Sequence, residues 1–260
     1  MSDQDLVRRL LDVAGRTYAE EAGITLRDKP APLYRLLVLS TLLSTRIKAG
    51  IAVDAARELH RAKLGTPHAV AGSTWQKRVD ALGRARYRRY DEQTATALGE
   101  GAQQIVDDYA GDLRKLREAA GRRPEDIRAR LRKFSRVGPV GADIFCREAQ
   151  AVWPELRPYL DKKALDGAER LGLPPDPGRL TALAEGAAPQ TLAAALVRVA
   201  LDAGLAERVT TQGYRPSRPP RRPGMAATYN HSEGEAPGQG SGTGAREGSG
   251  CSVRRRSSTI

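Results

Sequence analysis

The segment from residue 131 to residue 145 reads LRKFSRVGPVGADIF, and it decides the fold expected for this chain. A helix ends in its first half, Gly138 and Gly141 lie three residues apart, and Pro139 stands where a new helix can begin. The pattern predicts two helices joined by a tight turn. Gly138 lets a phosphate approach the backbone, and the unpaired N–H groups and dipole of the second helix favour an anion there. The alternative is an ordinary helix–helix turn in which the glycines serve geometry alone.

The sequence on both sides of this segment is also helical in character. Residues 1–212 are rich in Ala, Leu, Arg and Glu, their apolar positions recur at intervals of three and four, and β-branched alternation is almost absent. The pattern therefore predicts an all-α fold. We expect helices over residues 3–21, 33–46, 49–63, 74–81, 84–109, 112–120, 125–133, 139–152, 160–171, 177–185 and 190–206.

The composition changes near residue 212. Residues 213–260 contain nine Gly, five Pro, eight Arg and three Glu, with neither a helical nor a strand period, which predicts a disordered basic tail. The whole chain has 43 Lys+Arg against 31 Asp+Glu, a net charge of +12, and the part before the tail is basic as well. Such a surface favours a polyanionic partner, either nucleic acid or anionic lipid.

The remaining composition narrows the class of protein. No apolar run approaches the roughly 18–20 residues of a spanning helix, and the N-terminus lacks the pattern of a signal peptide. We therefore expect a cytoplasmic protein. Of the two polyanionic partners we expect nucleic acid and no membrane, and we expect the protein to be a monomer. With only Cys146, Cys251 and three histidines, neither a disulfide framework nor a His/Cys zinc site is expected.

A second informative segment, RPYLDKKALDGAERLGLP, covers residues 157–174 and places Asp161 at the opening of a helix. The order of hairpin, helix, short extended link and Leu-Asp at a helix start resembles the helix-hairpin-helix base-excision DNA glycosylases related to endonuclease III. In the hairpin of that family a glycine stands where this chain has Arg136, whereas Val137, Gly138 and Ala142 follow the family pattern. Residues 36–62 are similar to its early helix pair, and the resemblance spans residues 33–205.

This resemblance implies a two-lobed fold and a reaction. Residues 35–150 would form a helical bundle that ends in the hairpin, residues 1–34 and 151–212 would form the second lobe, and Asp161 would lie between them. The implied activity is hydrolysis of the N-glycosidic bond of a damaged or mispaired base in duplex DNA. A carboxylate beside C1′ stabilises the oxocarbenium ion that develops there and can activate water. The alternative role for Asp161 is a helix N-cap.

The other site residues implied by the resemblance contact DNA. Arg46, in the loop 44–48, takes the place of a glutamine that fills the gap left by the extruded base. The residues expected to bind DNA are Arg136, Val137, Gly138, Val140 and Gly141 in the hairpin, Arg46 and Lys48 in the loop, and Lys162 and Lys163 after Asp161. Residues 84–89 contain four arginines that form either a second phosphate-contacting strip or a solvated helix face.

The sequence also departs from the family pattern. Val140 stands where bifunctional members carry the lysine that attacks C1′, so the protein is expected to lack lyase activity. Residues 190–212 contain no cysteine, so no iron–sulfur cluster and no other cofactor is expected. Lys163 stands where members of the family often have a histidine. Two alternatives stay open: a DNA-binding module that keeps this fold without catalysis, and a helical adaptor whose basic tail contacts nucleic acid. The base lesion also stays open, because the nearest aromatic residues to Asp161 in the sequence, Trp153 and Tyr159, are more typical of a core.

Overall fold

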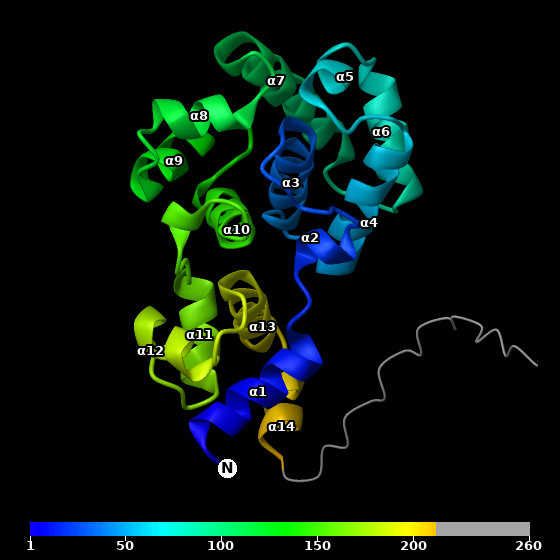
Figure 1. Ribbon diagram of the computed structural model, residues 1–260. Helices are drawn as coiled ribbons and strands as arrows, with labels where there is room; N and C mark the ends of the chain where they lie inside the picture. Colours follow the sequence, from blue (N-terminus) through cyan, green and yellow to red (C-terminus); the bar gives the residue numbers. More distant parts are fainter. Residues whose placement is uncertain (212–260) are drawn as a thin grey trace, which may run out of the picture. The chain divides into compact units, whose positions relative to one another are not determined.

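The regular elements of this chain are helices throughout residues 1–211, the part that the computed structural model describes, as the sequence predicts (Figure 1). The expected disordered tail lies outside the described residues. The elements in chain order are α1 (Asp3–Ala14), α2 (Tyr18–Glu21), α3 (Pro30–Leu43), α4 (Ala49–Arg61), α5 (Pro67–Ala71), α6 (Trp75–Arg84), α7 (Asp91–Tyr109), α8 (Leu113–Ala119), α9 (Pro124–Leu131), α10 (Pro139–Ala149), the 3-10 turn η1 (Pro154–Leu156), α11 (Lys162–Arg170), α12 (Pro177–Leu183), α13 (Pro189–Leu201) and α14 (Ala203–Thr210).

Two of the long helices expected from periodicity are interrupted. The helix expected over 3–21 stops at Ala14, and Thr17 starts α2 as an N-cap whose hydroxyl accepts a hydrogen bond from the Glu20 amide at 3.2 Å. In this capping box the Thr17 and Glu20 side chains each accept a hydrogen bond from the backbone N–H of the other residue. Such a motif starts a new helix, so α2 is separate from α1. The helix expected over 84–109 starts only at Asp91, because Arg86 adopts a φ of +60°, outside helical geometry.

Smaller differences lie at helix ends and in short elements. The prediction did not include α5, which covers only residues 67–71. The helix expected over 190–206 is divided at Asp202 into α13 and α14, and α14 continues to Thr210. The helix expected over 33–46 runs from Pro30 to Leu43, and the hydroxyl of Thr45 turns back to the Leu42 carbonyl at 2.7 Å. Residues 44–48 are therefore a loop, and Lys48 is the N-cap of α4.

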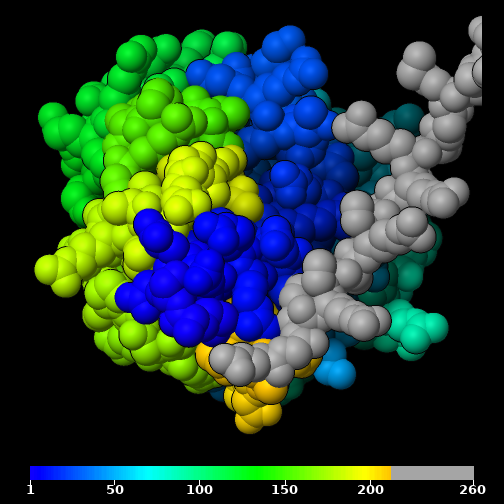
Figure 2. Space-filling model, turned by 60° about the horizontal axis from the view of Figure 1, so that its bottom comes forward, coloured from blue at the N-terminus to red at the C-terminus, as the bar shows by residue number. Residues whose placement is uncertain are grey.

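Buried apolar side chains form two separate cores. The larger core is built from α2 to α10 and η1, with α3 at its centre between α4 and α10 (Figure 1). The smaller core is built from α1, α11, α12, α13 and α14, and Figure 2 shows α1 lying against α13 and α14. Residues 18–34, which we expected in the second lobe, contribute Tyr18, Ile24, Leu33 and Tyr34 to the larger core.

The two cores meet where α10 packs on α13. This contact brings α10 beside α13, and α11, which begins after Asp161, packs on α13 as well. Across residues 1–211, no helix is long and apolar enough to cross a membrane.

Candidate functional site

The predicted hairpin consists of α9, the turn 132–138 and α10. Gly138 is the N-cap of α10, and the first helical hydrogen bond runs from the Ala142 amide to the Gly138 carbonyl at 3.0 Å. The amides of Val140 and Gly141 precede this bond, so the helix offers them no acceptor. A Cβ at Gly138 would meet nothing within 4 Å, and Val140 is 60% exposed. The start of α10 is therefore open to a ligand.

Arg136 adopts the left-handed conformation that usually favours glycine. Its φ is +59°, at the place where the resembled family has a glycine. The guanidinium donates from Nη1 to Oε1 of Gln93 at 3.0 Å and lies 5.9 Å from the centre of the Tyr90 ring. These contacts hold the Arg136 side chain against Gln93 and Tyr90.

A shallow cavity of about 680 Å³ lies between the hairpin and the loop 44–46, and we call it the hairpin groove. Arg46, Arg132 and Arg136 line it, and no carboxylate does. Arg46 and Arg132 are exposed and form no ion pair with the residues described. Val137 also lines the groove, but its side chain is only 4% exposed and belongs to the larger core. Val137 is one of the predicted DNA-binding residues, but its side chain packs in the core and is not available to contact DNA.

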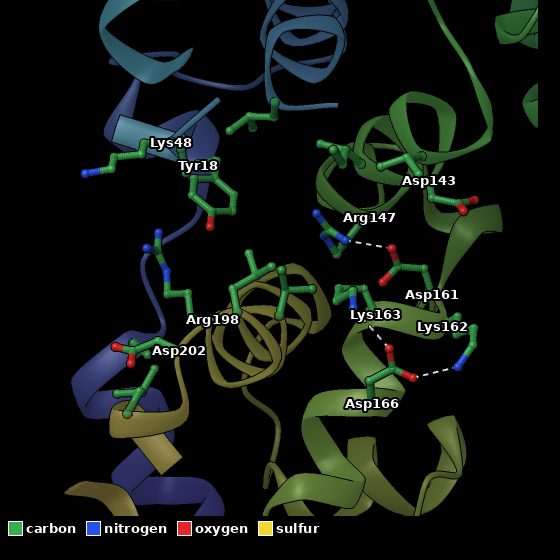
Figure 3. Close-up of a pocket in the computed structure, with 18 of the residues that line it drawn as sticks. Tyr18, Lys48, Asp143, Arg147, Asp161, Lys162, Lys163, Asp166, Arg198 and Asp202 are labelled. Atoms are coloured by element: carbon green, nitrogen blue, oxygen red, sulfur yellow. Dashed lines mark hydrogen bonds and ion pairs between the residues drawn. The ribbon is translucent and has the colours of Figure 1, made fainter. Parts of the chain in front are cut away.

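A larger cavity of about 1030 Å³ is lined by residues of both cores, and we call it the Asp161 cleft (Figure 3). It brings together five residues that the sequence analysis singled out from three segments: Lys48, Val140, Asp161, Lys162 and Lys163. Thr45 and Val140 line both this cleft and the hairpin groove. The two cavities therefore adjoin at the start of α10.

Both carboxylate oxygens of Asp161 have partners. Oδ1 accepts a hydrogen bond from the Ala164 amide at 3.1 Å, so the N-cap role proposed as the alternative is present. Oδ2 accepts a hydrogen bond from Nη1 of Arg147 at 2.7 Å (Figure 3). The two side chains are 9% and 4% exposed, which makes this a nearly buried ion pair. The pair fixes the orientation of the Asp161 carboxylate at the wall of the cleft.

The three lysines of the cleft differ in their partners. Nζ of Lys162 lies 2.8 Å, and Nζ of Lys163 lies 3.2 Å, from oxygens of Asp166, and their side chains are 91% and 48% exposed. The Asp166 hydrogen bond and charge raise the pKa of Lys162. Lys48 is exposed and, within residues 1–211, forms no ion pair. None of the three amines forms a hydrogen bond or ion pair with Asp161 within residues 1–211.

The sequence analysis missed two other cleft residues on α10. Asp143 and Arg147 follow Val140 by three and seven residues, so all three lie on one helical face and line the cleft. That spacing could have identified them. Asp143 accepts hydrogen bonds from the hydroxyl of Tyr159 at 2.6 Å and from Nε of Arg128 at 2.8 Å.

Tyr18 is the single aromatic residue among the described residues that line the cleft, and it was also missed. The backbone of Tyr18 is bound to α10. The buried carboxylate of Glu148, a residue of α10, accepts hydrogen bonds from the Tyr18 and Ala19 amides, each at 3.1 Å. The guanidinium of Arg198 lies 4.4 Å from the centre of its ring. Burial raises the pKa of Tyr18, against the opposing charges of Arg198 and Arg147, so the phenol stays protonated at neutral pH.

The other aromatic residues lie elsewhere. Trp153 is fully buried in the larger core, Tyr159 is half-buried against it, and neither lines the cleft. The four arginines at 84–89 lie at the end of α6 and in the loop before α7, so they do not form one helix face. Tyr87 connects the loop 85–90 to the loop 44–48. Its ring is buried, and its hydroxyl lies 3.1 Å from Oγ1 of Thr45. The arginine loop is therefore tied to the loop that carries Arg46.

Comparison with protein-family models, curated proteins and solved structures found no match to this chain. Among the described residues, no group of three or more His, Cys, Asp or Glu side chains is placed to hold a metal ion.

Proposed function

We propose that this protein has a two-lobed helix-hairpin-helix fold like that of DNA glycosylases and hydrolyses the N-glycosidic bond of a damaged or mispaired base in DNA. The observation that carries the proposal is the shared border of the two cavities at Thr45 and Val140. A DNA strand held in the cationic hairpin groove would have an extruded nucleotide next to the cleft that contains Asp161. The left-handed turn at Arg136 and the open backbone at Gly138 support this placement of the strand.

The proposed chemistry assigns a separate task to each part of the site. Amides at the start of α10 and the arginines of the hairpin groove bind phosphates. Extrusion of a nucleotide costs a few kcal/mol, part of which a residue inserted from the loop 44–48 can offset. The Asp161 carboxylate then stabilises positive charge on the sugar and orients the attacking water. Arg147 holds this carboxylate in one orientation.

The proposal is tested by incubating the protein with duplexes that each contain one modified base, followed by hot alkali. We expect strand breaks that need the alkali, since hydrolysis leaves an intact strand with an abasic site. We expect no covalent adduct with sodium borohydride, because Val140 offers no amine and both Lys162 and Lys163 bind Asp166. A trapped adduct would contradict the monofunctional mechanism. Absence of cleavage in every duplex would contradict the proposed enzymatic activity.

DNA binding through the hairpin groove predicts a steep dependence on salt. Replacing Arg46 and Arg132 by Gln should reduce the slope of log association constant against log salt concentration by about 2, since each lost phosphate contact removes about 0.9. Arg123→Gln is the matched control, because Arg123 is 75% exposed in its side chain and lines neither cavity. Fluorescence anisotropy at several salt concentrations measures the slope. An equal slope for the double variant and the control would exclude the groove as the binding surface.

One observation favours a second candidate, a DNA-binding module without catalysis. Both oxygens of Asp161 already have partners, an arrangement that a purely structural N-cap and ion pair would also require. This candidate predicts that no duplex is cleaved, and that DNA binding is sensitive to salt and unchanged by Asp161→Asn.

A further inference from the structure

The carboxylates that line the Asp161 cleft are all engaged. Asp143 accepts from Tyr159 and Arg128, Asp161 from Arg147 and the Ala164 amide, and Asp166 from two lysines. The remaining one, Asp202, accepts from Nη2 of Arg208 at 3.1 Å. Each of these four carboxylates therefore has at least one partner among the described residues.

Many donors of the cleft are paired as well, and Nη2 of Arg198 donates to Oε1 of Glu21 at 2.8 Å and to the Arg16 carbonyl at 3.0 Å. A few donor atoms nevertheless lack a partner among the described residues. Arg147 is 96% buried in its side chain, and its Nε has no hydrogen-bond partner in the described part of the chain. Nε of Arg198 is likewise buried and without a partner. The Tyr18 hydroxyl forms no hydrogen bond within residues 1–211, and Figure 3 shows it directed into the cleft near both arginines. An unpaired buried donor is costly, which points to a ligand that completes these groups.

We propose that Tyr18, Arg147 and Arg198 recognise the edge of an extruded base that carries carbonyl oxygens where the normal base carries an amine. Uracil, which has a carbonyl in place of the cytosine amine, is the simplest member of this class. The inference rests on the proposed function, because it assumes that the cleft receives a base. Tyr18 is the specificity-determining residue: its protonated hydroxyl donates to a carbonyl, and its oxygen can accept from a ring N–H.

The chemistry of the edge explains the expected discrimination. A carbonyl oxygen accepts hydrogen bonds from donors that are otherwise unsatisfied. An exocyclic amine in the same place would face these donors with its own donors. Sites that pair a buried polar group with the right substrate reject the wrong one strongly. We expect a preference of about tenfold to hundredfold for the carbonyl-bearing base.

The experiment uses duplexes that contain one 2′-fluoro-2′-deoxyuridine or one 2′-fluoro-2′-deoxycytidine, each opposite thymine. The fluorine opposes charge development on the sugar and prevents cleavage, and neither base forms a Watson–Crick pair, so affinities compare the bases alone. We expect the uracil duplex to bind about tenfold more tightly or better. Tyr18→Phe removes only the hydroxyl and keeps the ring beside Arg198, so this preference should fall several-fold. Tyr34→Phe is the matched control, since Tyr34 is buried and does not line the cleft.

The outcomes separate the two proposals. Equal affinities, or a preference for cytosine, with salt-sensitive binding intact would overturn the inference and leave the proposed function standing. A uracil preference that Tyr18→Phe leaves unchanged would overturn the role of Tyr18. Failure to bind any duplex in a salt-sensitive way would overturn the proposed function and the inference together.

Discussion

Asp161→Asn is expected to lower the rate of base release at least about 100-fold, the size of effect seen when one group that stabilises transition-state charge is removed. The neutral amide cannot stabilise an oxocarbenium ion as a carboxylate does. It can still accept from the Ala164 amide and so keep the N-cap of α11. The measurement is alkali-revealed strand cleavage under single-turnover conditions, on the modified base that the wild-type protein releases fastest.

This variant needs a control for stability, because Asn leaves the buried Arg147 guanidinium without its counter-charge. The double variant Asp161→Asn/Arg147→Met removes both charges together, so it should fold more stably than the single variant and remain inactive. Recovery of activity in the double variant would show that Asp161 acts only through stability. Wild-type activity in a folded Asp161→Asn protein would remove Asp161 from the mechanism.

Arg147→Met is expected to lower the free energy of unfolding by about 3 kcal/mol or more, the loss typical when one member of a buried ion pair is removed. The methionine fills much of the space of the arginine, but it leaves the Asp161 carboxylate with a single hydrogen bond in a site where its side chain is 9% exposed. Urea unfolding followed by circular dichroism measures the change.

The double variant completes a thermodynamic cycle for this pair. Its free energy of unfolding should lie above those of both single variants, because replacing a buried pair by uncharged groups is often nearly neutral. Strictly additive losses would show that the two side chains do not interact. A surface pair such as Arg123 with Asp126, whose side chains are 75% and 42% exposed, should give a coupling below about 1 kcal/mol.

Local signals in the sequence predicted the all-α fold and the start of the hairpin. Pro139 opens α10 after Gly138, and Asp161 caps α11, as short-range patterns indicate. The capping box at Thr17 and Glu20 was equally visible in the sequence, but apolar periodicity outweighed it in the prediction. No local pattern in the sequence predicted the left-handed turn at Arg86. The next residue, Tyr87, is buried and contacts Thr45 in the loop 44–48, which is distant in the sequence.

The composition of the Asp161 cleft was decided by tertiary structure. Asp161 was predictable as a helix-opening residue, but its partner Arg147 depends on how α10 meets α11. Tyr18 enters the cleft because Glu148, 130 residues away in sequence, binds its amide. Helix starts and turns are governed by hydrogen bonds within a few residues, so the sequence alone determines them. The cleft forms where two cores meet, and only packing between distant residues brings its donors together.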